Sequence, residues 1–163
     1  MWKRIFGCLL VLTLLLVPVL AARPDQVWKP DPGSPLELLY QVENDGTVTL
    51  TGGTLALAPG ETAVHLPETI DGKPVRSIDY GAFQDASLSA PLYLPDSLVV
   101  IEESAFASSQ ITELHMGAHL ERIGEYAFFD CTGLTGDLVF PDGLTEIGSW
   151  CFSRCTGLSG SHR

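Results

Sequence analysis

The sequence has 163 residues, of which 20 are acidic and nine are basic, so the net charge at neutral pH is −11. An acidic surface repels nucleic acid and anionic lipid, and we therefore expect neither as a partner. The length suits one domain of ordinary size.

The first 21 residues have the pattern of a secretory signal peptide. Lys3 and Arg4 carry two positive charges, and the chain from Ile5 to Leu20 is apolar and uncharged. Cleavage is predicted after Ala21. An uncleaved membrane anchor is the alternative, but the apolar run is shorter than the ~20 residues that span a bilayer. We expect export, as a secreted or cell-surface protein, with no membrane insertion after cleavage.

Residues 22–36 are predicted to form a proline-rich linker, because they contain four prolines and show no periodicity. Trp28 lies within this segment. It would be either exposed or docked on the domain, and docking is favoured because a lone exposed tryptophan is unusual.

Residues 37–66 predict an N-terminal β cap. Strand-like patterns at 37–42 and 47–51 flank Asn44-Asp45-Gly46, which is a tight-turn signal, so the two segments should form a hairpin. A third strand candidate covers 63–67. The end units of a repeat array must differ from internal units, because they cover its exposed apolar end.

Residues 67–163 contain one motif written four times, the last copy incomplete. In each copy an Ile is followed five residues later by a Phe, at Phe83, Phe106, Phe128 and Phe152. A regular spacing of 22 to 24 residues between these phenylalanines is the signature of a solenoid, whose core is buried between neighbouring copies. The four rings should therefore form one buried stack.

Each copy should contribute a short strand and a short helical turn. The predicted strands are 92–94, 114–116 and 138–140, stacked in parallel and connected with right-handed crossovers. The Ala-Phe segments are predicted as the helical turns. Because the chain ends before the strand of the fourth copy, the segment 138–140 is expected to be an open sheet edge. Such an edge recruits other chains, so self-association through it is expected.

Three cysteines remain after signal cleavage, and an odd number of cysteines is a poor basis for a disulfide framework. Buried free thiols are the expected state of Cys131, Cys151 and Cys155, and a disulfide between Cys131 and Cys155 is the alternative. A zinc site would need His162 as a fourth ligand, and His115 and His119 lack helical geometry. We expect no metal, no cofactor and no catalytic residue.

The stretch LERIGEYAFFDCTGLTGDLVFPDGLTEIGSWCFSRCTGL shows the unit most clearly. It resembles the BspA-like leucine-rich repeats of bacterial and protist surface proteins, whose unit runs approximately IP..V..IG..AF..C..L..I. The resemblance covers about residues 37–160, with Gly117 in place of a proline and Cys151 in place of an alanine. It implies a curved leucine-rich repeat solenoid that is exported, recognises or adheres to proteins, and carries out no catalysis.

The outward positions of the predicted strands form the candidate partner-binding face. They are Tyr93, His115 and Val139, flanked by Glu113 and Asp137, and tyrosine is favoured at interfaces. The predicted function is a secreted or cell-surface protein-binding or adhesion module with a host or cell-surface protein as partner. The first alternative is a structural spacer, or a fragment of a larger exported repeat protein without its own ligand. The second is an exported enzyme whose catalytic domain lies elsewhere.

Overall fold

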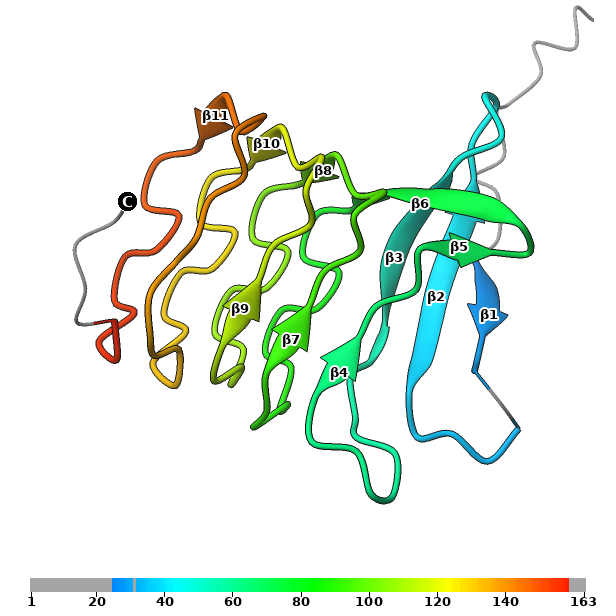
Figure 1. Cartoon of the computed structure of the whole chain (residues 1–163), viewed down its shortest axis with the longest axis horizontal. Coiled ribbons are helices and arrows are strands. Elements are labelled where there is room, and N and C mark those ends of the chain that lie inside the picture. Colours follow the sequence, from blue (N-terminus) through cyan, green and yellow to red (C-terminus); the bar gives the residue numbers. More distant parts are fainter. Residues whose placement is uncertain (1–24, 31, 159–163) are drawn as a thin grey trace, which may run out of the picture.

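The computed structural model describes residues 25–30 and 32–158, and the predicted signal peptide lies outside these residues. The described chain forms a β-solenoid of stacked coils with a β-hairpin at one end (Figure 1). Its strands, in chain order, are β1 (Gln26–Trp28), β2 (Glu37–Val42), β3 (Val48–Thr54), β4 (Val64–His65), β5 (Thr69–Ile70), β6 (Lys73–Ile78), β7 (Leu92–Tyr93), β8 (Val100–Ile101), β9 (Leu114–His115), β10 (Arg122–Ile123) and β11 (Glu146–Ile147).

The predicted N-terminal hairpin is present as the antiparallel pair β2 and β3. Its turn uses Gly46 at φ +84°, and the Asp45 side chain accepts a hydrogen bond from the Thr47 amide at 2.9 Å. Hydrogen bonds from the amide and the hydroxyl of Thr47 hold the pKa of the Asp45 carboxyl below its usual value. The turn is thus built from its own side chains, as the sequence indicated.

Part of the predicted linker belongs to the sheet instead. β1 pairs antiparallel with β2, Gln26 opposite Tyr40 and Trp28 opposite Leu38. The Trp28 side chain packs against the hydrophobic core, so docking is confirmed. Residues 26–28 of the predicted linker are therefore a strand, because valine and tryptophan favour strands and β2 offers them a free edge.

One sheet runs from the hairpin along the whole solenoid. Its order is β1-β2-β3-β6-β8-β10-β11, with β5 paired to β6, and all pairs from β3 to β11 on this path are parallel. Ile101 and Ile123, which open the Ile-to-Phe motif of their repeats, lie in the strands β8 and β10, which were not predicted. Both isoleucines are fully buried. The sheet therefore joins the hairpin to the repeats as one continuous hydrogen-bonded ladder.

A second, three-stranded sheet has the order β4-β7-β9, also parallel (Figure 1). β7 and β9 confirm the strands predicted near 92–94 and 114–116. β4 lies inside the region predicted as the cap, yet it is the first strand of this repeat sheet. Residues 138–140 are not a strand, contrary to prediction, although Leu138 is still buried and Val139 still points outward.

The predicted phenylalanine stack is present. Ring centroids lie 5.3 Å apart for Phe83 and Phe106, 5.1 Å for Phe106 and Phe128, and 5.2 Å for Phe128 and Phe152. The first three rings are buried, whereas Phe152 is half-buried because no described coil covers its outer side. Leucine and isoleucine side chains from both sheets complete the core around this stack.

The segments that carry the phenylalanines are turns, and none of the described residues is helical, so the predicted helical turns were wrong. Each turn places two left-handed residues around its Phe, at positions −2 and +2. These pairs are Gly81 and Asp85, Ser104 and Ser108, Tyr126 and Asp130, and Trp150 and Arg154, with φ between +54° and +65°. Two left-handed residues interrupt the repeated αR conformation that a helix needs, which explains the outcome.

Amides of each Phe turn bind carbonyls of the next coil. Ser104, Phe106 and Ser108 donate to the carbonyls of Glu125, Ala127 and Phe129 at 2.7 to 2.9 Å, and the neighbouring turns repeat the same three bonds. Backbone hydrogen bonds therefore join the turns from coil to coil, as they join the strands.

Candidate functional site

A row of three aromatic rings crosses the outer face of the smaller sheet. The parallel register places His65, Tyr93 and His115 side by side on β4, β7 and β9, while the preceding residue of each strand is buried. The alternation of strand side chains explains this arrangement. His65 and Tyr93 stack at 4.3 Å, and Tyr93 and His115 stack at 4.0 Å with planes only 3° apart. We call these three residues the ring row.

Acidic side chains border the end of the ring row at β9. Glu113 lies 3.4 Å from the imidazole of His115, and both side chains are about half exposed, at 54% and 45%. Asp137 is exposed on the following segment. Since the whole chain carries a net charge of −11, a partner with basic groups would be attracted to this border.

The hydrogen-bond ladder of the smaller sheet stops just beyond β9. The Thr112 amide donates to the Ala90 carbonyl at 3.1 Å, and in the next coil the Thr135 amide donates to the Thr112 carbonyl at 2.9 Å. Gly136 then turns the chain at φ +82°, and the pairing ends. Among the described residues, neither the Leu114 amide nor the Met116 amide donates a hydrogen bond.

A groove opens where the next strand would have paired. It has a volume of about 430 Å³ and is lined by Glu113, Leu114, His115, Met116, Thr135, Gly136, Asp137 and Val139. Val139 contributes an apolar side chain to this lining and is 75% exposed. The groove has an apolar side, two carboxylates and a free strand edge, and this combination suits a peptide segment better than a small metabolite.

The structure brings together four of the five residues predicted for the partner-binding face. Glu113, His115, Asp137 and Val139 line the groove, and Tyr93 stacks on His115. Sequence reasoning missed His65. The signal was available, because Val64-His65-Leu66-Pro67 has the same pattern as Leu92-Tyr93-Leu94-Pro95.

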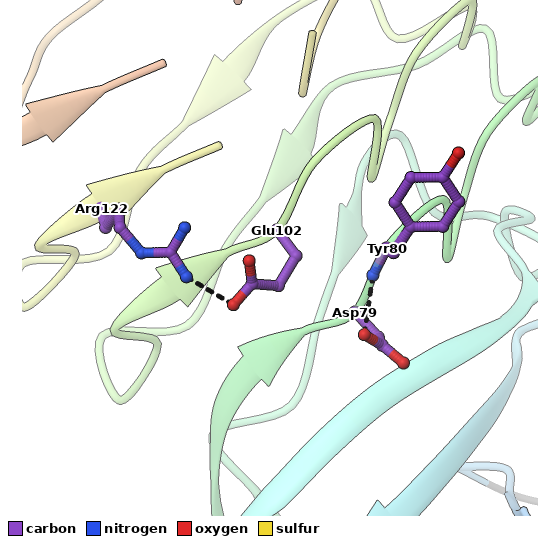
Figure 2. A network of polar contacts seen from close by, with 4 residues as sticks. All are labelled: Asp79, Tyr80, Glu102 and Arg122. Atoms are coloured by element: carbon purple, nitrogen blue, oxygen red, sulfur yellow. Dashed lines mark hydrogen bonds and ion pairs between the residues drawn. The ribbon is translucent and has the colours of Figure 1, made fainter. Parts of the chain in front are cut away.

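A second polar strip follows the larger sheet (Figure 2). Arg122 on β10 forms an ion pair with Glu102, which follows β8, and the Tyr80 amide donates to the carboxylate of Asp79. A shallow hollow of about 350 Å³ beside the ion pair is lined by Glu103, Glu125 and Glu146 as well. Of the residues that line this hollow, Arg122 is the basic one. The carboxylates of the hollow are not paired in a way that suits acid–base chemistry.

The three described cysteines are buried and free, as expected from the sequence. The Cys131 thiol donates to the Phe106 carbonyl at 3.2 Å, and the Cys155 thiol donates to the Phe128 carbonyl at 3.0 Å. Burial raises the pKa of the Cys151 thiol to about 12, and a hydrogen bond to Cys131 together with burial raises that of Cys155. Buried thiols with raised pKa values, as at Cys151 and Cys155, act in packing and are poor nucleophiles.

Two further findings concern the described residues as a whole. They contain no group of three or more His, Cys, Asp or Glu side chains placed to hold a metal ion. They also contain no helix that is long and apolar enough to cross a membrane.

Residues 62–161 match the family model of the BspA type leucine-rich repeat region, which is described as having six copies. The matched region begins just before β4, so it includes the smaller sheet and the part of the larger sheet from β5 onward. None of the curated proteins compared with the chain matches it.

Several solved structures share the fold. A leucine-rich repeat protein from Bacteroides capillosus is 26% identical over 74% of this chain and 86% of its own, with a TM-score of 0.59. The leucine-rich repeat protein of T. pallidum is 26% identical over 80% of this chain and 69% of its own, with a TM-score of 0.53. A leucine-rich cell surface protein from Faecalibacterium prausnitzii is 22% identical over 76% of this chain but only 38% of its own, with a TM-score of 0.55.

Proposed function

Because this chain belongs to the BspA-type leucine-rich repeat family, we propose that it is a non-catalytic protein-binding module that acts in adhesion. Leucine-rich repeat domains generally mediate contacts between proteins, and the family's members are often secreted or carried on the surface. The proposed partner is a host or cell-surface protein.

The observation that carries this proposal is the ring row. Three stacked, solvent-facing rings form a rigid platform that loses little conformational freedom when a partner covers it. Tyrosine is enriched in the centres of protein interfaces, and the acidic border at Glu113 and Asp137 would select a partner with basic residues.

Export is the second part of the proposal. It is supported by the charged, apolar and small-residue sequence of residues 1–21. Expression in a host with a functional secretion pathway should yield a protein whose first residue is Ala22, as measured by mass spectrometry of the intact chain. Retention of residues 1–21 in a membrane fraction would instead favour the uncleaved anchor.

Binding is tested with a panel of purified extracellular-matrix and cell-surface proteins, measured by surface plasmon resonance. We expect at least one saturable interaction, and we expect the double variant Tyr93→Ala/His115→Ala to weaken it at least tenfold. The matched control is Tyr80→Ala, which removes an aromatic side chain that is 64% exposed after β6 in the other sheet. Equal binding by the wild type, the double variant and Tyr80→Ala would exclude the ring row as the binding surface. No binding to any panel member would favour a structural spacer.

A further inference from the structure

The open edge of β9 offers a more specific mode of recognition. Resting on the proposed binding function, we propose that this edge accepts an extended peptide segment as an added β-strand, with an arginine of the peptide stacked on His115. The segment would lie in the groove between β9 and residues 135–139 and would continue the sheet β4-β7-β9 by one strand.

The backbone of β9 is prepared for such a strand. In this parallel sheet, the Leu92 and Leu94 amides of one coil donate to the Glu113 and His115 carbonyls of the next. The Leu114 amide and carbonyl and the Met116 amide therefore face the opposite side, and no described residue bonds to them. An unpaired strand edge is a template for main-chain pairing with another segment.

The chain's own next segment fails to fill this edge because of a single residue. Thr112-Glu113-Leu114-His115-Met116 corresponds to Thr135-Asp137-Leu138-Val139-Phe140 once Gly136 is left out. Gly136 adopts φ +82°, a left-handed conformation that glycine reaches without strain. Length alone does not prevent pairing, because the equally long stretch from Leu88 to Leu92 leads into the paired strand β7. The left-handed turn at Gly136 therefore diverts residues 137–140 from β9 and opens the groove.

The side chains around the edge define the chemistry of the incoming strand. Tyr93 covers one face of the His115 ring at 4.0 Å, and the ring row ends there. A planar side chain at the next position would extend the row. Glu113 and Asp137 border the same place, so a planar cation fits best, and arginine both stacks on rings and pairs with carboxylates.

A second copy of the chain suits this edge less well. Two β9 strands pairing antiparallel would bring Glu113 and Asp137 of both copies together, and like charges on facing strands are destabilising. Pairing of β9 with the β4 edge of another copy is also hindered, because residues around Ser34, Leu36 and Ala56 lie beside β4. A basic peptide meets neither obstacle.

The test uses a phage-displayed library of random heptapeptides, selected on the wild-type protein and counter-selected on a variant that lacks Gly136. The deletion leaves the ring row and Glu113 intact and lets residues 137–140 close the ladder on β9. Thermal unfolding followed by circular dichroism establishes that the deletion variant is folded. We expect enriched peptides to carry a central arginine among β-branched residues and to bind the deletion variant at least tenfold more weakly.

Hydrogen exchange of the enriched peptide's complex gives a direct readout of strand addition. The Leu114 and Met116 amides should exchange at least tenfold more slowly when the peptide is bound, and replacing the peptide's central Arg by Glu should abolish this protection. His115→Ala should weaken binding several-fold without removing the amide protection at saturating peptide.

Three results would overturn the inference. Peptides that bind wild type and deletion variant equally, yet lose affinity in Tyr93→Ala/His115→Ala, would leave the proposed binding face standing and refute strand addition. A wild-type dimer that dissociates on deletion of Gly136, measured by sedimentation, would assign the edge to a second copy. Failure to enrich any peptide would refute the inference, and the protein panel described above would then judge the proposed function separately.

Discussion

The rings of Phe106 and Phe128 lie 5.1 Å apart and within 4° of parallel, in neighbouring coils of the solenoid. Phe106 also stacks on Phe83, at 5.3 Å and 22° from parallel, so it is enclosed on both sides and fully buried. A residue in this position contributes both buried apolar area and contacts between coils.

Phe106→Ala should lower the free energy of unfolding by about 3–5 kcal/mol, because it leaves a cavity in the middle of the stack. Phe152→Ala is the matched control. Its ring stacks on one neighbour in the row and is half-buried, so the loss should be clearly smaller. Urea unfolding followed by fluorescence measures both. Equal losses, or a loss below about 1 kcal/mol for Phe106→Ala, would contradict the stacked core.

Trp150 occupies one of the left-handed turn positions, with φ +60° and a side chain that is 64% exposed. Trp150→Gly should stabilise the fold by about 1 kcal/mol, because glycine adopts this conformation without the steric cost paid by other residues. Trp150→Ala removes the same exposed ring but keeps the strain, so it should be near neutral. Thermal unfolding compares the two, and equal melting temperatures would show that the backbone conformation is not strained.

Gly148 is required for the close approach of two coils. A Cβ atom added there would lie 2.3 Å from the backbone nitrogen of Glu125, and backbone cannot move away cheaply. Gly148→Ala should therefore cost about 1–3 kcal/mol, as overpacking does elsewhere.

The matched control for this prediction is Gly143→Ala. The nearest atom to its added Cβ is the Leu120 carbonyl oxygen at 4.0 Å, and its φ is not left-handed. Chemical denaturation should find this variant as stable as the wild type or slightly more stable. A Gly148→Ala variant with unchanged stability would mean that the coils are further apart than described.

The Cys151 thiol makes the stability of the fold sensitive to alkali. Burial raises its pKa from a usual value of 9.0 to about 12. Because the folded protein holds this thiol in its neutral form, the contribution of the thiol to the free energy of unfolding is complete below pH 9. That contribution is lost as the pH rises toward 12. By pH 10 the loss from this thiol should be about 1 kcal/mol.

Cys151→Ala should remove the alkaline loss of stability that comes from this thiol. Alanine fits the position, because the neighbouring repeat has Ala127 there. Denaturant unfolding of wild type and variant at pH 7.5, 9, 10 and 10.5 should show that the variant gains stability relative to the wild type above pH 9. Parallel pH profiles would show that Cys151 ionises freely in the folded protein.

The sequence predicted those parts of the fold that depend on repetition and on local turn chemistry. The spacing of the phenylalanines set the number of coils and the ring stack, and Asn44-Asp45-Gly46 set the hairpin turn. The strand at 100–101 and its equivalents were missed, because two-residue strands carry no period-two pattern that can be recognised. Their regularity comes from stacking, which is a tertiary effect.

The sequence predicted the residues of the candidate site but did not predict the groove that they line. Tyr93, Glu113, His115, Asp137 and Val139 were selected because strand alternation points them outward. The groove depends instead on where the ladder stops, and that depends on the conformation of Gly136. Counting residues would not have found it, because the stretch from Leu134 to Leu138 is as long as the stretch from Leu88 to Leu92, which leads into a paired strand.

The three hydrogen bonds that link each Phe turn to the next have a mechanical consequence. They recur once per coil, and each coil contacts only its neighbours. A force that pulls the ends of the solenoid apart would therefore peel coils one at a time rather than rupture the molecule in a single event. With 22 to 24 residues per coil, each step would lengthen the chain by roughly 80 Å. A solenoid built in this way lengthens in small increments and keeps its remaining coils folded under load.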